Sequence, residues 1–207
     1  MTHTLIFDGH ILGASFASGD RFVAGRWFAS PFGAFADLMW CRPDGTRLLI
    51  APRPEVRDFV ARHYAFEELI LDDVRVERTG AKVVEVRAGP VTLRFDIGPR
   101  GIESRLLGLR PPWLRTMPAW IAIEDSVLRP IVSSRFAAGD VRARGTTRSG
   151  ARECYGIHDF RPAQVSATLG GIDLGSVAAC PPAGFGFSEF PSRPALVRVT
   201  SRFATRA

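Results

Sequence analysis

Residues 118–130 read Pro-Ala-Trp-Ile-Ala-Ile-Glu-Asp-Ser-Val-Leu-Arg-Pro and separate two blocks of short, strand-like runs. The apolar side chains recur at the spacing of one helical face, and the main members of this face are Trp120, Ile123 and Val127. Pro118 suits the first position of a helix, whereas Pro130 lacks the N–H group that would continue it, so the helix should stop or kink near residue 129. We therefore predict an amphipathic helix at 118–129 that packs across a sheet or closes one end of a barrel.

A second amphipathic helix is predicted at 54–64, where Pro54 stands at the first helical position. Its apolar stripe follows helical spacing and consists of Val56, Phe59, Val60 and Tyr64. His63 falls beside this stripe, and we expect it on the helix surface or as a partner of the C-terminal end of the helix dipole. The region 98–117 is rich in Pro but also in Leu and Trp, which predicts an irregular, packed connection or a lid.

The rest of the chain alternates strand-like runs with turn signals. The clearest hairpin places runs 35–41 and 46–51 on either side of Arg42-Pro43-Asp44-Gly45, and Asp8-Gly9 predicts another tight turn. Residues 91–97 alternate strictly between apolar and polar side chains, the pattern of a strand with one buried and one wet face. Further strands are expected at 5–7, 11–16, 22–28, 69–77, 82–87, 141–147, 152–157, 163–169, 172–177 and 195–203.

These patterns predict an α+β protein that is predominantly antiparallel β, either barrel-like or built from two packed sheets, with two amphipathic helices at 54–64 and 118–129. We expect a single domain over 1–207. The alternative is a pair of β-rich halves, 1–100 and 138–207, joined by a helical segment at 101–137.

The composition is that of a folded protein, and it indicates the cellular compartment that we expect. Of the 207 residues, 46% are apolar and 23% are charged, which excludes a disordered protein. The net charge is +6, and Lys82 is the only lysine among 27 basic residues, but the Arg residues are scattered without a dominant cluster. The three cysteines lack metal-knuckle or disulfide-framework spacing, and neither a signal peptide nor a bilayer-spanning run is present. A soluble, cytoplasmic protein without a metal site is the prediction.

The densest group of candidate catalytic residues lies in the run Glu153-Cys-Tyr-Gly-Ile-His-Asp159. An imidazole such as that of His158 can act as a general base near neutral pH when a carboxylate orients it. In a regular strand, Glu153 and Tyr155 would face away from His158, and Asp159 could serve His158 only if the strand turned there. The chain has no phosphate-binding loop or dinucleotide fingerprint, so we expect no cofactor.

The aromatic loops around 26–35 and 185–190 favour a different function, because ligand pockets are mostly apolar with a few convergent polar groups. The predicted ligand contacts are Trp27, Phe28, Phe185, Phe187 and Arg161. Our first expectation is therefore a protein that binds a small apolar or amphipathic molecule in a β-rich pocket.

Two other functions stay open on the sequence alone. The first is a cofactor-free enzyme that uses His158 with Glu153, Tyr155 or Asp159 as acid and base. The second is nucleic-acid association through the Arg-rich hairpin 141–152, which is the less favoured reading because that segment has no stacking aromatic residue. The apolar segment 104–117 could also form the interface of a homodimer.

Overall fold

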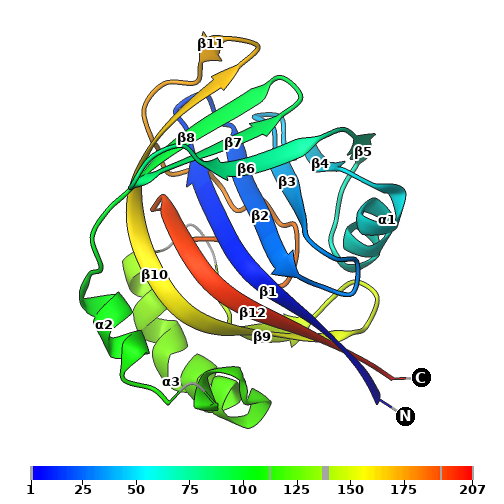
Figure 1. The fold of residues 1–207 in the computed structure, drawn as a ribbon, viewed down its shortest axis with the longest axis vertical. Helices are drawn as coiled ribbons and strands as arrows, with labels where there is room; N and C mark the ends of the chain where they lie inside the picture. The colour runs from blue at the N-terminus through cyan, green and yellow to red at the C-terminus, as the bar shows by residue number, and fades with distance from the viewer. Residues whose placement is uncertain (1, 112, 137–139, 192, 207) are drawn as a thin grey trace.

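The computed structural model describes residues 2–111, 113–136, 140–191 and 193–206, and its strands form a sheet that curls into a half-barrel (Figure 1). The strands are β1 (Thr2–Ser15), β2 (Arg21–Ala29), β3 (Phe35–Cys41), β4 (Arg47–Ala51), β5 (Glu68–Leu71), β6 (Val74–Arg78), β7 (Val83–Ala88), β8 (Val91–Ile97), β9 (Arg144–Thr146), β10 (Arg152–Leu169), β11 (Ile172–Asp173) and β12 (Ala195–Arg206). The helices are α1 (Pro54–His63), α2 (Ile102–Gly108), the short 3-10 helix η1 (Leu114–Thr116) and α3 (Pro118–Phe136).

The strands follow one another across the sheet in the order β5-β4-β3-β2-β1-β12-β10-β8-β7-β6. Every neighbouring pair in this order is antiparallel except β4 and β5, which run parallel. The protein is therefore mostly β as predicted, but its sheet is mixed. Strands from both sides of the helical segment pair directly, since β1 lies beside β12 and β10 lies beside β8.

Two strands are longer than expected. Strand β1 continues through Asp8-Gly9 with a shift of register toward β2, so the predicted turn is wrong. A Cβ atom on Gly9 would lie 2.3 Å from the carbonyl oxygen of Arg26, so this glycine permits close backbone approach and not a turn. Strand β10 joins the runs predicted separately at 152–157 and 163–169, with a bulge between Ile157 and Asp159.

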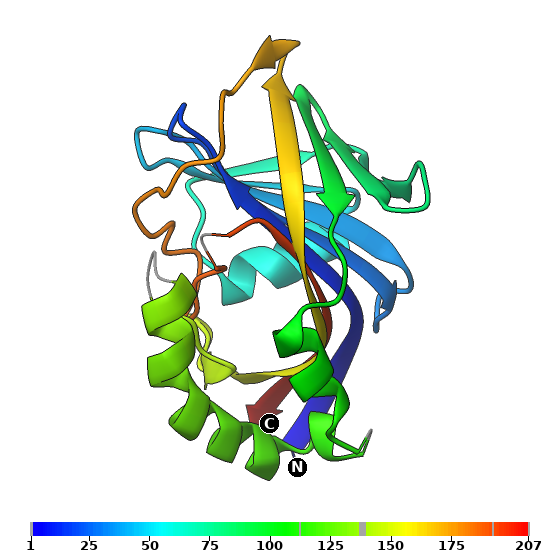
Figure 2. The same cartoon turned by 90° about the vertical axis from the view of Figure 1, so that its left-hand side faces the viewer.

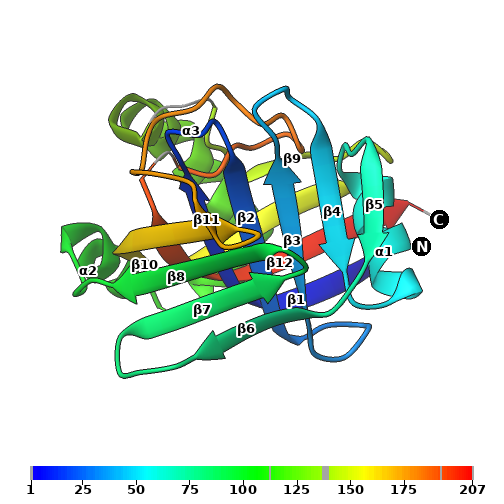
Figure 3. The same ribbon diagram turned by 90° about the horizontal axis from the view of Figure 1, so that it is seen from above.

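The predicted strand 69–77 is also corrected, because Asp72 and Asp73 divide it into β5 and β6. These two short strands occupy the opposite ends of the sheet order. Seen from above, β2–β4 and β6–β8 lie on opposite sides of the curl (Figure 3).

The core has two parts, one on each face of β4. Leu48 and Ile50 belong to a large cluster that fills the inside of the curl and includes the apolar side of β8. Leu49 and Ala51 belong to a second cluster, which α1 covers with Val56 and Val60 among other side chains. The alternation predicted for residues 91–97 is confirmed, since the exposed fractions of all four apolar residues of β8 are at most 2%.

The predicted helices are both present, with corrections. Helix α1 ends at His63, whose side chain is buried and not on the surface. Helix α3 continues through Pro130 to Phe136, because a proline removes one backbone donor without preventing the next residues from bonding. Two members of its predicted apolar face, Ile123 and Val127, are exposed, while Ile121, which lies beside that face, is buried.

The region 98–117, predicted to be irregular, contains α2 and η1. Figure 2 shows α2 and α3 gathered at the end of the half-barrel where the two termini lie. Within the described ranges, no helix is long and apolar enough to cross a membrane.

Candidate functional site

A cluster of hydroxyl and carboxyl groups lies where the end of α1 meets strands β10 and β12. Glu153 and Tyr155 are two residues apart on β10 and therefore share a face. The register with β12 places Ser201 directly opposite Tyr155. Tyr64 follows α1 and caps it, with its backbone N–H bonded to the carbonyl of Val60. We call Tyr64, Glu153, Tyr155 and Ser201 the tyrosine–glutamate cluster.

Hydrogen bonds connect the members of this cluster directly. The Oη of Tyr64 lies 2.8 Å from both carboxylate oxygens of Glu153 and 3.0 Å from the Oη of Tyr155. The Oγ of Ser201 donates to Oε1 of Glu153 at 2.8 Å. Among the residues that the structure describes, the hydrogen-bond partners of this carboxyl are hydroxyl groups, and none is a cation.

Burial changes the acidity of these groups. Glu153 is 2% exposed, and this desolvation raises the pKa of its carboxyl to about 7 despite the hydrogen bonds from Ser201 and the tyrosines. Burial, followed by the charge of Glu153, also raises the pKa of Tyr64 and of Tyr155 well above the ordinary value. The carboxyl therefore changes its protonation state near neutral pH, whereas both phenols stay protonated.

The geometry couples the carboxyl to the outermost hydroxyl. When Glu153 is ionised, Tyr64 can donate its only proton to the carboxylate, and Tyr155 can then donate to Tyr64. When Glu153 is protonated, it can donate to Tyr64, and Tyr64 can donate to Tyr155. The proton of Tyr155 is then free for a different acceptor. Tyr155 can therefore present an acceptor or a donor, depending on Glu153.

An aromatic wall stands beside Tyr155. The ring of Phe187 stacks on that of Tyr155, with centroids 5.7 Å apart and an angle of 23° between the planes. Gly145 of β9 makes room for Phe187, since a Cβ atom there would lie 2.2 Å from the ring. Both tyrosines and Phe187 remain half-buried, so the cluster extends from a buried carboxyl to partly exposed rings.

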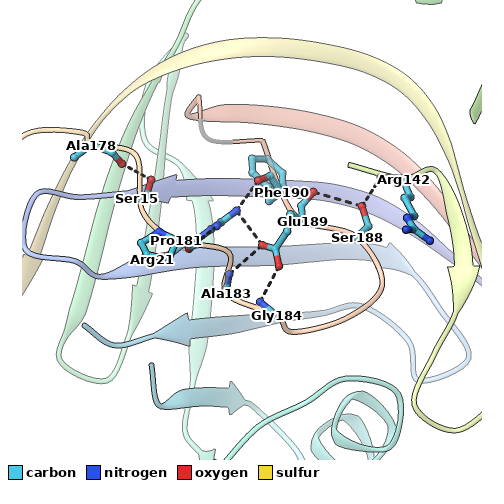
Figure 4. Close-up of polar contacts among 10 residues, drawn as sticks. All are labelled: Ser15, Arg21, Arg142, Ala178, Pro181, Ala183, Gly184, Ser188, Glu189 and Phe190. Carbon is cyan, nitrogen blue, oxygen red and sulfur yellow. Dashed lines mark hydrogen bonds and ion pairs between the residues drawn. The ribbon is translucent and has the colours of Figure 1, made fainter. Parts of the chain in front are cut away.

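The loop that carries Phe187 is held by a buried ion pair (Figure 4). Arg21 of β2 is 4% exposed, and its guanidinium lies 3.1 Å from the carboxylate of Glu189. The same guanidinium donates to the carbonyls of Pro181 and Phe190, at 3.1 and 2.6 Å. Glu189 in turn accepts hydrogen bonds from the backbone N–H groups of residues 183 and 184.

The other predicted catalytic residues lie elsewhere. His158 shares a hydrogen bond of 2.8 Å with Thr200, which donates to Asp8 at 2.8 Å. Thr200 and Ser201 are adjacent on β12, so this histidine and the tyrosine–glutamate cluster lie on opposite faces of the sheet. Burial and the nearby Arg198 lower the pKa of His158. Hydrogen bonding from Arg198, which binds Asp8 with both terminal nitrogens, lowers the pKa of Asp8.

Asp159 does not orient His158. Its carboxylate accepts a hydrogen bond from Ser104 of α2 and pairs with Arg100 at 3.1 Å, so it connects β10 to the helical segment. The structure therefore brings together Glu153 and Tyr155 from the predicted catalytic group.

The predicted ligand contacts are likewise dispersed. Trp27 donates to the buried carboxyl of Asp37 at 3.0 Å, while Phe28 lies on the opposite face near Arg26 and Arg198. Phe185 is buried and packs near Phe66, with ring centroids 5.7 Å apart. Phe187 is the only one of the five that contacts the cluster.

Arg161 binds the carbonyl oxygen of Gly98 through two nitrogens, at 3.0 and 2.7 Å. Gly98 also belongs to a recess of about 380 Å³ at the junction of β8 and β10. The recess is lined by Lys82, Asp96, Ile97, Gly98, Pro162, Ala163 and Gln164. It contains no aromatic side chain, unlike the surroundings of Tyr155, and so fits an apolar ligand less well.

Sequence reasoning missed Tyr64 and His63. Helical spacing places Tyr64 on the apolar stripe of α1, and its partner Glu153 lies 89 residues away in the chain. Buried His63 bonds Thr147 at 3.1 Å and Ser149 at 2.7 Å, which joins α1 to the turn before β10. No local pattern signals either contact.

Within the part of the chain that the structure describes, no group of three or more His, Cys, Asp or Glu side chains could hold a metal ion. No protein-family model matches this sequence, and comparison with curated proteins and with solved structures returns no significant match. The function must therefore be argued from the cluster itself.

Proposed function

We propose that this protein binds a small amphipathic molecule beside the tyrosine–glutamate cluster. The observation that carries the proposal is a buried carboxyl, Glu153, whose partners are hydroxyl groups and which stands next to the stacked rings of Tyr155 and Phe187. A buried carboxyl without a cation costs free energy, and an apolar side chain would stabilise this position more. Perturbed groups of this kind concentrate at functional sites.

The chemistry of the cluster suggests the polar part of the ligand. Tyr155 offers an acceptor when Glu153 is ionised and a donor when it is protonated. A hydroxyl group can bond to Tyr155 in both states, because it donates and accepts. The apolar part would pack against Phe187, which comes from one of the aromatic loops predicted to contact a ligand. A long-chain alcohol represents this ligand class.

Two observations favour ligand binding over the other functions. An acid–base pair of His158 with Glu153 or Tyr155 would have to act through the sheet, because these groups lie on opposite faces. In the hairpin 141–152, Arg142 pairs with Asp140 at 2.5 Å and Arg144 lies 3.8 Å from Asp125, which reduces the charge available to a phosphate backbone.

Native mass spectrometry of gently purified protein tests the proposal first. We expect an adduct of a small molecule that is absent from the denatured spectrum. Binding of decanol is then measured by its displacement of the fluorescent probe N-phenylnaphthylamine. Decyl chloride, which has the same apolar chain without a hydroxyl, serves as the matched ligand.

Tyr155→Phe should weaken decanol binding about tenfold, since one hydrogen bond to the ligand is lost, and should leave decyl chloride unaffected. Phe28→Leu is the control variant, because Phe28 lies on the opposite face and is 41% exposed. A bare-chain mass together with no saturable displacement by decanol would refute the proposal.

A further inference from the structure

The helical segment exposes an unusual amount of apolar surface. Of thirteen large apolar side chains that are exposed in the described residues, seven lie between residues 102 and 127, with exposed fractions from 45% to 80%. They are Ile102, Leu106, Leu109, Trp113, Met117, Ile123 and Val127. Exposed apolar side chains that gather in one segment of the chain are a sign of an interaction site.

Helix α2 exposes its apolar side to solvent and buries a polar residue. Ile102, Leu106 and Leu109 follow at i, i+4 and i+7, so they share one face, and this face is exposed to solvent. The side that packs on β10 carries the polar Ser104, which is buried and bonded to Asp159. A helix that only served the core would bury the apolar side and expose the serine.

Helix α3 buries Ile121 but also exposes apolar side chains. Ile123 and Val127 lie one helical turn apart, and both are exposed. Glu124 is turned toward the protein, where its carboxylate bonds Arg110 and accepts a hydrogen bond from Trp120. Asp125 also lies inward and accepts the backbone N–H of residue 143 at 2.6 Å. The acids of α3 are therefore withdrawn from the surface that the apolar side chains form.

The charge of the segment is positive. Residues 100–136 contain six Arg and three acidic residues, so this segment carries half of the net charge of +6. Arg105 is exposed on α2, and the side chain of Arg100 is 71% exposed although it pairs with Asp159. A second copy of the same chain would bring like charges together across a twofold interface, which disfavours a homodimer.

We propose that α2, η1 and α3 dock on the surface of an anionic phospholipid bilayer. The exposed apolar side chains enter the boundary between headgroups and acyl chains, and the exposed Arg100 and Arg105 contact lipid phosphates. Trp113 is 69% exposed between α2 and η1 and is the residue type that favours this boundary. The helices lie along the surface and do not cross it. This inference is independent of the ligand proposed for the tyrosine–glutamate cluster.

Vesicle flotation with the full chain tests the inference. We expect the protein to float with vesicles of phosphatidylcholine mixed with phosphatidylglycerol, to bind pure phosphatidylcholine more weakly, and to dissociate as salt is added. The variant Leu109→Ser/Trp113→Ser should bind the anionic vesicles at least about tenfold more weakly. Ile172→Ser is the matched control, since Ile172 is 73% exposed on β11, and its binding should not change.

Circular dichroism shows whether the variants are folded; both changed side chains are exposed, so we expect native spectra. Two results would overturn the proposal. One is equal flotation of the double variant and the wild type. The other is no binding to anionic vesicles. If sedimentation velocity then shows a dimer that the double variant dissociates, this surface belongs to a contact with a second copy of the chain.

Discussion

Thr200 and Ser201 are consecutive residues of β12, and each serves a different polar network on its own side of the sheet. Thr200 lies between His158 and Asp8, at 2.8 Å from each, whereas Ser201 donates to Glu153 at 2.8 Å. The sheet thus separates a network with charged Arg198 from one built on neutral hydroxyl groups. This separation leads to different pH responses on the two sides.

The first prediction concerns Glu153. Its pKa is about 7 in the folded protein against an ordinary 4.5, so folding favours the protonated form. Its contribution to stability is therefore complete below pH 4.5 and is lost as the pH rises through about 7. Relative to wild type, Glu153→Gln should gain about 3 kcal/mol in free energy of unfolding between acidic and mildly alkaline pH.

Urea unfolding of both proteins across this pH range measures that difference. A constant difference between Glu153→Gln and wild type would show that the pKa of the carboxyl is the same in the folded and unfolded protein. Asp37 is a second buried carboxyl whose pKa burial raises, to about 6, so Asp37→Asn provides a comparison on another part of the sheet.

The second prediction concerns His10, which lies on the face of Asp8. Burial, followed by the charges of Arg198 and Arg26, lowers its pKa to about 4. A depressed pKa of this kind adds stability above the ordinary value of 6.5, and that stability is lost as the pH falls through about 4. NMR titration should find the His10 imidazole neutral at about pH 5.5. A midpoint near its ordinary value would show that this ring is solvated.

The third prediction uses two glycines. Gly145→Ala should push Phe187 away from Tyr155 and lower stability by about 1–3 kcal/mol, because the new Cβ would overlap the ring. Decanol binding should weaken with it. Gly108→Ala is the control, since nothing lies within 4 Å of a Cβ at the end of α2, and it should be neutral or slightly stabilising. Equal thermal unfolding midpoints for the two variants would contradict the close packing of Phe187 against Gly145.

The fourth prediction concerns the loop around Glu189. Arg21→Met should cost about 3–5 kcal/mol, since it leaves the Glu189 carboxylate without its cation in a site where that side chain is 11% exposed. Adding Glu189→Gln should recover part of the loss. Limited proteolysis should cut near residue 187 faster in the single variant. Strictly additive free energies in the double-mutant cycle would show that the pair does not interact.

Local patterns predicted much of the fold. The alternation at 91–97 and the Gly45 turn both appear as expected, and Gly45 has a φ of 87° that suits glycine. Helix α1 ends one residue before its predicted last residue. These features depend on neighbouring residues, which is why a single sequence contains them.

The remaining features depend on distant contacts. The division between β5 and β6 arises because Ala51 pairs with Leu71 in the parallel register, which no pattern within 69–77 reveals. The candidate site needs the register of β10 against β12 and the approach of Tyr64, so periodicity could place Glu153 and Tyr155 on one face but could not name their partner.

The two-residue connection between β5 and β6 has a topological consequence. Strands at opposite ends of the sheet order are joined by Asp72 and Asp73 alone, and the chain ends meet where Thr2 pairs with Arg206. The first and last strands are therefore neighbours within the sheet, and the connection at residues 72–73 joins its two edges. New ends opened at 72–73, with residues 2 and 206 joined by a short linker, would give a circular permutant with the same strand neighbours. Strands β5 and β6 do not pair with each other, so such a chain would lose the only direct covalent connection between the two edges of the sheet.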